Sequence, residues 1–410
     1  MTKRRVVITG LGLITPVGIG VNESWKNILN GVSGITNITK FDASNFKSQV
    51  AGEVKNFNPD LYLNPKDSRR MDTFMQFGLV AGIEAIKDSG LEVTEGNAER
   101  IGVSIGSGIG GINLIETTSD NFDQGGPRKV SPFFVPGTII NMISGNLSIM
   151  YGLKGPNISI VTACTTGTHS IGDASRMIEY GDADVMIAGG SEAAITELTV
   201  AGFSAAKALT QRNDDPKTAS RPWDKDRDGF VIGEGAGVMV IEEYEHAKKR
   251  GAKIYCELGG YGMSADAYHI TAPSIDGPKR SMINAINNAG INLDEVGYIN
   301  AHGTSTQLGD LNETNAIKET FNKHAYNLVV NSTKSMTGHL LGGAGGIESV
   351  FTALAIHHQI SPPTMNIFNQ DSECDLDFAA NEAKEINIKA ALKNNFGFGG
   401  TNGSLIFKKF

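Results

Sequence analysis

The chain has 410 residues with 50 glycines but only 13 prolines, and it carries a formal net charge of −8. This composition excludes a disordered or collagen-like chain and favours a packed α/β protein with many tight turns. The acidic balance also argues against a general nucleic-acid-binding protein, which needs a basic surface.

The N-terminus enters a strand-like run directly after its basic residues, and this run is too short and too broken by glycine for a signal peptide. No segment approaches the roughly 18 consecutive apolar residues of a membrane-spanning helix. The three cysteines, Cys164, Cys256 and Cys374, are widely spaced and form neither a disulfide framework nor a zinc-binding pattern. We therefore expect a protein of the reducing cytoplasm without a bound metal.

Short β-branched runs alternate with longer helical patterns, which is typical of βαβ units and mainly parallel sheets. In the first part of the chain we expect strands at Val6–Thr9, Ile101–Ile105, Ile158–Val161, Val185–Ala188 and Val238–Glu242. A helix should begin after Asp72, whose side chain can cap it, and should end at Gly90. Its apolar stripe consists of Met75, Leu79, Ile83 and Ile86.

After Gly251 the same order of elements restarts. Strands are expected at Cys256–Leu258, Val296–Ala301, Leu328–Asn331 and Ser404–Phe407. The sequence Thr-Gly-Thr-His at 166–169, which follows one strand, is echoed by Thr-Gly-His at 337–339, which follows another. We infer an α/β fold made of two half-domains of similar topology, at residues 1–250 and 251–410.

Cys164 lies where a predicted strand runs into a turn of small residues followed by helix-compatible sequence. At a helix N-terminus the dipole and the free N–H groups favour a thiolate, and the same N–H groups can stabilise an oxyanion. A buried structural cysteine is the alternative, and the residues alone leave both interpretations open.

Two histidines, His302 and His339, also lie in polar turns beyond predicted strands. A single histidine is more often structural than catalytic, and this pair lacks the spacing and the carboxylate of a metal site. Ligands of α/β proteins gather beyond the carboxyl ends of strands, where all three segments fall. The glycine run at 106–111 does not match the register of a dinucleotide fingerprint, so no nucleotide cofactor is expected.

Four motifs together resemble the β-ketoacyl-[acyl carrier protein] synthases of the thiolase-like superfamily, and most of all their elongating type II members of bacterial fatty acid synthesis. The motifs are TAC-x-TGTH around Cys164, AHGTST-x-x-GD around His302, NSTKS-x-TGH-x-LG-x-AG around His339, and FGFGGTN at 396–402. The resemblance covers essentially the whole chain. It implies a layered α-β-α-β-α sandwich of two pseudo-symmetric halves. It also implies an acyltransferase that elongates acyl chains by decarboxylative Claisen condensation with malonyl-[acyl carrier protein]. Thr165 departs from the family, which usually has a smaller residue beside the nucleophile.

The resemblance also implies roles for individual residues. The implied catalytic residues are the nucleophile Cys164, the two histidines His302 and His339, the Lys334–Glu348 pair and the gate Phe398. The implied substrate-binding residues are Thr304, Thr306, Ile109, Phe134, Gly397 and Gly399. The implied docking patch for acyl carrier protein consists of Lys66, Arg69, Arg70, Arg128, Lys129 and Lys207. Some relatives hold a monovalent cation near Asn300, Glu348, Asn394 and Asn395. The family further implies a homodimer, and no cofactor beyond the carrier's phosphopantetheine arm.

Two alternatives remain at this point. A ketosynthase of a polyketide pathway shares the same cysteine and histidines. A chain-length partner subunit keeps the fold but lacks the nucleophile, whereas this chain retains Cys164 and both histidines.

Overall fold

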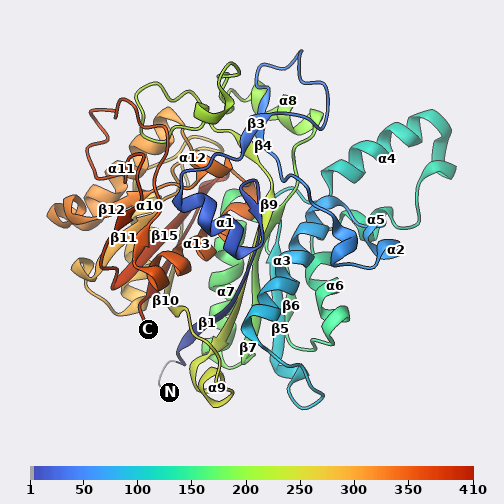
Figure 1. Cartoon of the computed structure of the whole chain (residues 1–410), viewed down its shortest axis with the longest axis horizontal. Helices are drawn as coiled ribbons and strands as arrows, with labels where there is room; N and C mark the ends of the chain where they lie inside the picture. The colour runs from blue at the N-terminus through green and yellow to red at the C-terminus, as the bar shows by residue number, and fades with distance from the viewer. Residues whose placement is uncertain (1–3) are drawn as a thin grey trace.

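The computed structural model describes residues 4–410. Its main sheet is one continuous path of strands that consists of two half-sheets, with helices between the half-sheets and on both outer faces (Figure 1). One half of the path runs in the order β1-β9-β7-β5-β6. These strands are β1 (Val6–Thr15), β5 (Ile101–Gly106), β6 (Asn157–Ile158), β7 (Val185–Glu192) and β9 (Gly235–Glu243). In this order the first two pairings are antiparallel and the next two are parallel.

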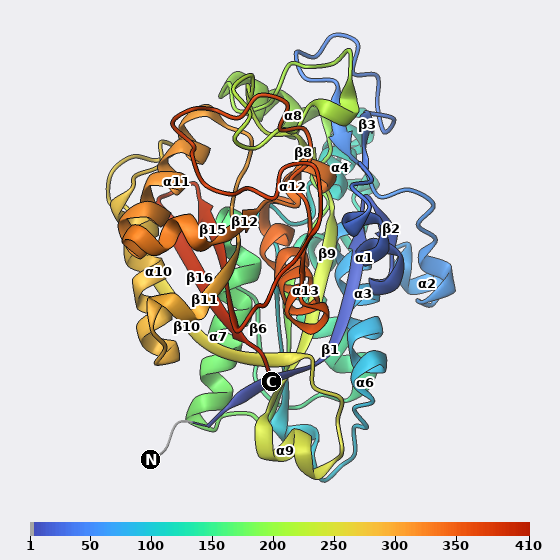
Figure 2. The same ribbon diagram turned by 60° about the vertical axis from the view of Figure 1, so that its left-hand side comes forward.

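The other half of the path repeats this arrangement as β10-β16-β15-β11-β12. Its strands are β10 (Cys256–Ala265), β11 (Val296–Asn300), β12 (Val329–Asn331), β15 (Ala390–Gly397) and β16 (Thr401–Lys408). Here too the first two pairings are antiparallel and the next two are parallel. A short antiparallel contact between β1 and β10, from Val6↔Leu258 to Ile8↔Cys256, joins the halves (Figure 2).

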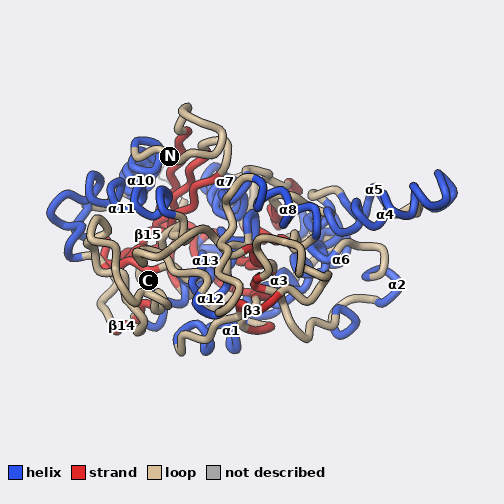
Figure 3. Tube along the Cα trace, turned by 90° about the horizontal axis from the view of Figure 1, so that it is seen from above, coloured by secondary structure: helices blue, strands red, loops and turns tan. Residues whose placement is uncertain are grey.

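Helices form three layers around these half-sheets. On one outer face, α3 (Thr73–Ser89) packs on β1, β9 and β7, and on the other face α10 (Asp276–Ala289) packs on β10 and β16 with α11 (Gln307–Phe321) beside it. Between the half-sheets lie α7 (Thr166–Tyr180) and α13 (Ala344–His358), which contact strands of both halves and each other (Figure 3). The predicted α-β-α-β-α sandwich is confirmed.

The two middle helices meet through glycine. A Cβ atom on Gly167 of α7 would lie 2.4 Å from the backbone nitrogen of Gly346 in α13, and one on Gly345 would lie 2.3 Å from that of Thr168. Cβ contacts this short do not occur, so only glycine lets the first turns of these helices touch. This contact places the loops before α7 and α13 side by side.

The remaining elements are shorter or peripheral. They are β2 (Gly18–Ile19), α1 (Val21–Leu29), β3 (Ile35–Asn37), β4 (Val50–Gly52), α2 (Pro65–Ser68), α4 (Ile112–Gly125), α5 (Phe134–Thr138), α6 (Met142–Tyr151), α8 (Glu197–Ala205), β8 (Ile232–Gly233), α9 (Tyr244–Lys249), α12 (Lys334–Thr337), β13 (Ile360–Ser361) and β14 (Lys384–Glu385). Within residues 4–410, no helix combines the length and the apolar character needed to cross a membrane.

Most predicted elements are present, with two differences. The helix after Asp72 is α3: the Asp72 carboxylate accepts the Phe74 N–H, and Gly90 closes the helix in a left-handed conformation. The strand predicted at Ile158–Val161 is wrong beyond Ile158, because the chain leaves the ladder there and the Ser159 hydroxyl bonds the Ile105 carbonyl instead. Strand β15 was not predicted.

Candidate active site

Cys164 lies in a single 3₁₀ turn, Ala163–Thr165, directly before α7. The turn is entered through Ala163 with a φ of 50°, a left-handed conformation that costs a non-glycine residue about 1–3 kcal/mol. Thr165, the departure from the family pattern, is fully buried and hydrogen-bonds with Thr162 O at 2.5 Å and Thr401 Oγ1 at 3.1 Å. Thr165 therefore connects the turn that carries Cys164 to β16.

The thiol of Cys164 does not have the low pKa that its position before a helix suggested. Burial raises its pKa to about 12, against the lowering effects of Lys334 and of the backbone N–H groups of Phe398 and Cys164. The desolvation of a thiolate outweighs these effects. The expectation of a resting thiolate is therefore wrong, and the resting group at neutral pH is a thiol.

His302 follows β11, and its backbone is held by a buried glutamate. The N–H groups of His302 and Gly303 donate to the two carboxylate oxygens of Glu313 at 2.9 and 2.8 Å. The His302 Nδ1 lies 3.2 Å from Asn395 Nδ2. Burial, with the nearby charge of Lys334, lowers its pKa well below the ordinary value, so the ring is neutral.

His339 is fixed by its backbone and has a free imidazole. Its N–H donates to Val231 O at 2.7 Å, and its carbonyl accepts the Gly233 N–H at 2.9 Å. Among the described residues, neither ring nitrogen has a hydrogen-bond partner. Burial also lowers the pKa of this ring well below its ordinary value, and the two imidazoles lie edge-on with centroids 5.2 Å apart. Two neutral histidines thus face one space.

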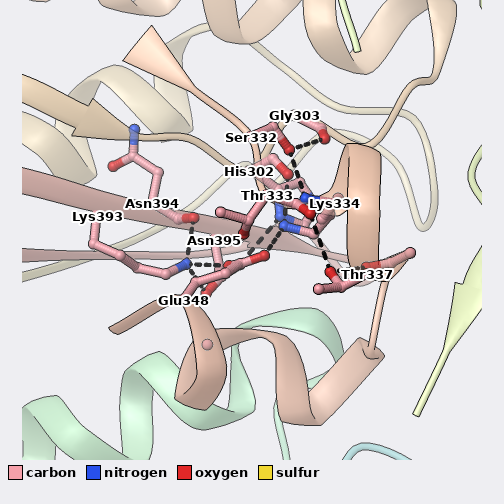
Figure 4. Close-up of polar contacts among 12 residues, drawn as sticks. His302, Gly303, Ser332, Thr333, Lys334, Thr337, Glu348, Lys393, Asn394 and Asn395 are labelled. Carbon is pink, nitrogen blue, oxygen red and sulfur yellow. Dashed lines mark hydrogen bonds and ion pairs between the residues drawn. The ribbon is translucent and has the colours of Figure 1, made fainter. Parts of the chain in front are cut away.

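Two lysines share one glutamate close to His302 (Figure 4). Lys334 Nζ pairs with Glu348 Oε1 and donates to the His302 carbonyl at 2.6 Å, whereas Lys393 Nζ lies 2.7 Å from Glu348 Oε2. All three side chains are at most 1% exposed. Burial acts to raise the pKa of Glu348, but the two ammonium groups outweigh it and hold that pKa below its usual value.

A cavity of about 370 Å³ brings these groups together. Its lining includes these predicted site residues: Cys164, His302, His339, Thr304, Thr306, Ile109, Gly397 and Phe398. The Phe398 ring is 39% exposed and lies 6.2 Å from that of Phe203. Two predicted substrate-binding residues do not line the cavity: Phe134 lies on α5, and Gly399 lies in the turn directly after Phe398.

The predicted docking residues lie in or beside short helices and turns, and all except the half-buried Arg70 are exposed. Lys66 and Arg69 lie on and directly after α2, and Arg128 and Lys129 follow α4; both helices lie at the same end of the molecule (Figure 1). Lys207 follows α8 between Ala206 and Ala208, which line the cavity. Arg70 is partly engaged, with its guanidinium 4.0 Å above the Phe133 ring.

The cation that the family resemblance implied does not fit the residues present. An alkali cation needs several oxygens directed at one point. Here Glu348 Oε2, the Asn394 carbonyl and Asn395 Oδ1 all bind the Lys393 ammonium. Asn394 Oδ1 accepts from Ser404 instead, and Asn300 is buried at the end of β11. Within residues 4–410, no group of three or more His, Cys, Asp or Glu side chains is placed to hold a metal ion.

Sequence reasoning missed Lys393, Glu313 and Glu192. Glu192 is fully buried and accepts from the backbone of Gly108, Ile109 and Gly342, so it shapes the loop that carries Ile109. The only signal for Lys393 was its place between the short apolar run Ala390–Leu392 and the FGFGGTN motif.

Comparison with known proteins finds similarity to β-ketoacyl synthases along the whole chain. The family model "Beta-ketoacyl synthase, N-terminal domain" matches residues 3–247, and "Beta-ketoacyl synthase, C-terminal domain" matches residues 255–368. The 3-oxoacyl-[acyl-carrier-protein] synthase 2 of Vibrio harveyi is 58% identical over 412 residues, which cover 100% of this chain and 99% of the relative. The enzyme of that name from Staphylococcus aureus (strain COL) is 53% identical over 410 residues, covering 100% and 99%.

Solved structures show the same fold at lower identity. A type II PKS acyl-carrier protein in complex with its ketosynthase bound to the hexaketide gives a TM-score of 0.93 at 36% identity, covering 100% of both chains. The ishigamide ketosynthase/chain length factor gives a TM-score of 0.93 at 33% identity, again covering 100% of both chains.

Proposed function

The chain belongs to the β-ketoacyl synthase family and is an acyltransferase, a condensing enzyme of fatty acid synthesis; we propose that Cys164, His302 and His339 carry out its chemistry. The observation that supports these roles is one cavity in which a thiol at a helix start faces two neutral imidazoles, one of them without any hydrogen-bond partner among residues 4–410.

In the first half-reaction, Cys164 Sγ attacks the thioester carbonyl of an acyl carrier protein. A carbon–sulfur bond forms to Cys164, the carrier's bond breaks, and the carrier leaves as a thiol. Because the Cys164 pKa is raised, its proton has to leave as the bond forms, and a neutral imidazole in the cavity can take it. The backbone N–H groups of Cys164 and Phe398 stabilise the oxyanion, since both already lie against the sulfur.

In the second half-reaction, a malonyl thioester loses carbon dioxide. The electrons of the broken carbon–carbon bond form an enolate, whose oxygen accepts hydrogen bonds from the Nε2–H groups of His302 and His339. The enolate carbon attacks the acyl-Cys164 carbonyl, the new carbon–carbon bond forms, and Cys164 leaves as a thiolate that regains a proton. The product is a carrier-bound β-ketoacyl chain two carbons longer than the acyl group.

The surroundings of the cavity supply binding. Thr304 and Thr306, with Oγ1 atoms 3.0 Å apart, bind the pantetheine arm, and Ile109 borders the acyl chain. Phe398, between Gly397 and Gly399, moves as a gate when the acyl chain enters. Lys334, paired with Glu348, tunes the charge around the histidines. The reaction needs no cofactor beyond the carrier's phosphopantetheine arm.

We further propose a homodimer and an acyl carrier protein partner. Exposed apolar side chains gather on α4, α5 and α6, which is the kind of surface that a second copy covers. They are Ile115, Phe122, Val135, Ile139, Ile149 and Met150. Phe134 lies on the same α5, so it would reach substrate only through that interface. A cytoplasmic location stays a prediction from the cysteine pattern.

The polyketide alternative is not favoured, because full-length relatives at 53–58% identity are 3-oxoacyl-[acyl-carrier-protein] synthases of fatty acid synthesis, whereas the ketosynthase of the type II PKS complex shares 36%. A partner subunit without a nucleophile is not favoured either, since Cys164 lines the cavity beside both histidines.

The test uses acyl- and malonyl-carrier protein with two variants. Cys164→Ala should form no acyl adduct by mass spectrometry yet keep malonyl decarboxylation, because both histidines remain. His339→Ala should lower decarboxylation by about 10²–10³-fold, the usual effect of losing one oxyanion donor. A stoichiometric adduct on Cys164→Ala, or normal decarboxylation with slow acylation in His339→Ala, would invert these roles.

A further inference from the structure

The buried ammonium group of Lys393 has a partner for each of its three N–H donors, and the proposed reaction assigns no role to it. Its three N–H donors bind Glu348 Oε2 at 2.7 Å, the Asn394 carbonyl at 2.7 Å and Asn395 Oδ1. The side chain is 0% exposed, although burying an unpaired ammonium is strongly unfavourable. Each of the three acceptors is an oxygen, which is also the ligand type of an alkali cation.

This ammonium helps to fix which way the Asn395 amide faces. Lys393 can only donate, so the oxygen end of the amide faces it, and Thr168 Oγ1 donates to the same oxygen at 2.5 Å. The carboxylate of Glu348 can only accept, so the NH₂ end faces Glu348 Oε2 at 3.0 Å. The two ionised groups therefore leave a single orientation for Asn395 (Figure 4).

The Asn395 orientation in turn selects the tautomer of His302. The second N–H of the amide is directed at His302 Nδ1, 3.2 Å away, so Nδ1 must accept and the ring proton must be on Nε2. An Nε2–H group is what the enolate oxygen requires from this ring. A flipped amide would present an oxygen to Nδ1 and move the proton to the wrong nitrogen.

We propose that Lys393 is a positioning residue that replaces a monovalent metal ion: its ammonium occupies the oxygen cluster of Glu348, Asn394 and Asn395, and through Asn395 it holds His302 in the Nε2–H form. The inference rests on the proposed function of His302. If Lys393 has this role, the enzyme does not depend on alkali cations, because the second positive charge beside Glu348, next to that of Lys334, belongs to the chain itself.

The electrostatics agree with this role. Together Lys334, Lys393 and Glu348 carry one net positive charge, and the charge of Lys393 contributes to lowering the pKa of both His302 and His339. Burial lowers the pKa of Lys393 itself to about 8, against the opposing pull of Glu348, so it stays largely protonated at neutral pH. The same ammonium therefore orients one histidine and adds to the effects of burial and of Lys334, which keep both rings neutral.

The experiment compares two variants of Lys393 that both remove its charge but differ in how much of the volume of its side chain they leave empty. Lys393→Ala removes the ammonium and opens a cavity lined by the three oxygens, whereas Lys393→Met fills the same space without charge. Malonyl decarboxylation and condensation are measured in tetramethylammonium buffer, with and without potassium or rubidium at constant ionic strength. Lys389→Ala, which removes an exposed lysine just before β15, is the control for general charge loss.

We expect the wild type and Lys389→Ala to be active and indifferent to potassium. Both Lys393 variants should lose about 10–100-fold in decarboxylation, the usual effect of removing a supporting partner of a catalytic group. Potassium should restore Lys393→Ala but not Lys393→Met, and rubidium soaked into crystals should give an anomalous peak at the three oxygens only in Lys393→Ala. Rescue by an ion is a result that a merely structural lysine would not produce.

Three outcomes would overturn the inference: activation of the wild type by potassium, full activity of both Lys393 variants in cation-free buffer, or a loss in Lys393→Ala that no cation repairs. Thermal unfolding midpoints show whether each variant is folded at the assay temperature, and rates are compared among folded variants. A wild type with no condensation activity at all would instead refute the proposed function, so the two failures are distinguishable.

Discussion

The sulfur of Cys164 is subject to opposing influences on its protonation. The helix start and Lys334 favour the thiolate, whereas burial disfavours it and wins, raising the pKa to about 12. Activation must therefore come with the substrate, through proton transfer and oxyanion stabilisation, and not from a preformed anion. This resting state protects the enzyme against adventitious oxidation, which follows thiolate character.

The raised pKa predicts how alkylation of Cys164 depends on pH. Iodoacetamide reacts with the thiolate, so its rate at Cys164 should rise about tenfold per pH unit between about pH 7 and 9.5 without a plateau. The measurement is mass spectrometry of the Cys164 peptide over time. Cys256 and Cys374, both 0% exposed, serve as unreactive internal controls. A plateau below pH 8.5 would instead show a thiolate stabilised at rest.

The proposed catalytic residues were predictable from sequence because each lies in a motif of small and polar residues in the region after a strand, although only His302 follows its strand closely. Lys393 was not, because its role depends on a partner from another element: Glu348 lies 45 residues earlier by the numbering, on α13. The Cys164 pKa was mispredicted for a related reason. A helix start is visible in a sequence, whereas the burial that opposes it depends on the packing of both halves.

At the scale of elements, the contact between α7 and α13 brings Cys164 and His339 together. The thiol precedes α7 and the imidazole precedes α13, and the helices touch at Gly167, Gly345 and Gly346 with no room for a side chain. Gly338, in the second of the Thr-Gly echoes, faces Val231 and Ile232 instead, so only Gly167 of the two belongs to the contact. The consequence of this contact for the site was not predictable, since the echoes do not show that the two helices are neighbours.

Gly167→Ala should therefore damage both stability and activity. Its methyl group would meet backbone atoms of Gly346 at 2.4 Å, which cannot rotate away, and overpacking of this kind costs about 1–3 kcal/mol. Gly202→Ala in α8 is the matched control: its methyl would meet nothing within 4 Å, so the better helix propensity should stabilise by about 0.4–1 kcal/mol. The readouts are the free energy of unfolding and the condensation rate. Equal effects of the two substitutions would show that the α7–α13 contact is not tight.

The missed strand β15 shows where periodicity fails. Its sequence AALKNNFG combines four apolar side chains with a lysine and two asparagines, yet all of Ala390–Asn395 is buried, because the strand lies between β11 and β16. The polar side chains are satisfied inside the site, so no alternation of polar and apolar residues appears. The opposite error occurs at β6. There an apolar run predicted a strand from Ile158 to Val161, but the strand ends at Ile158 and the Val161 side chain is 52% exposed.

At the scale of the whole molecule, the site is built from both halves of the sheet. Cys164 comes from the half with β1, whereas His302, His339 and Lys393 come from the half with β10. We propose that the halves divide at residues 1–250 and 251–410, as the repeated strand order suggests. Neither half alone contains the set of groups that the reaction needs.

The charge of the whole molecule is also unevenly placed. The chain has a net charge of −8, yet α2 and α4 lie at the same end of the molecule (Figure 1), and the exposed Lys66, Arg69, Arg128 and Lys129 lie on or directly after these helices. None of these four side chains forms an ion pair with another of the described residues, so they are available to a partner. A local basic surface on an acidic protein selects acidic partners and repels most others.

The last prediction is that Lys66→Glu combined with Arg69→Glu weakens the use of carrier-bound substrates. Two exposed ion pairs of about 0.2–1 kcal/mol each correspond to a rise in KM of about 2- to 30-fold. The KM of the wild type should also rise with salt, because salt screens the attraction between the basic residues and the acidic carrier. The KM of the variant should depend less on salt, because the mutations have already removed this attraction. Small pantetheine thioesters make no contact with these turns, so their KM should not change. The matched control is Lys249→Glu with Lys323→Glu, which makes the same change of charge on two exposed lysines that lie within other helices. An equal loss on carrier-bound and small substrates, or an equal rise in the control, would show that the basic residues of α2 do not dock the carrier.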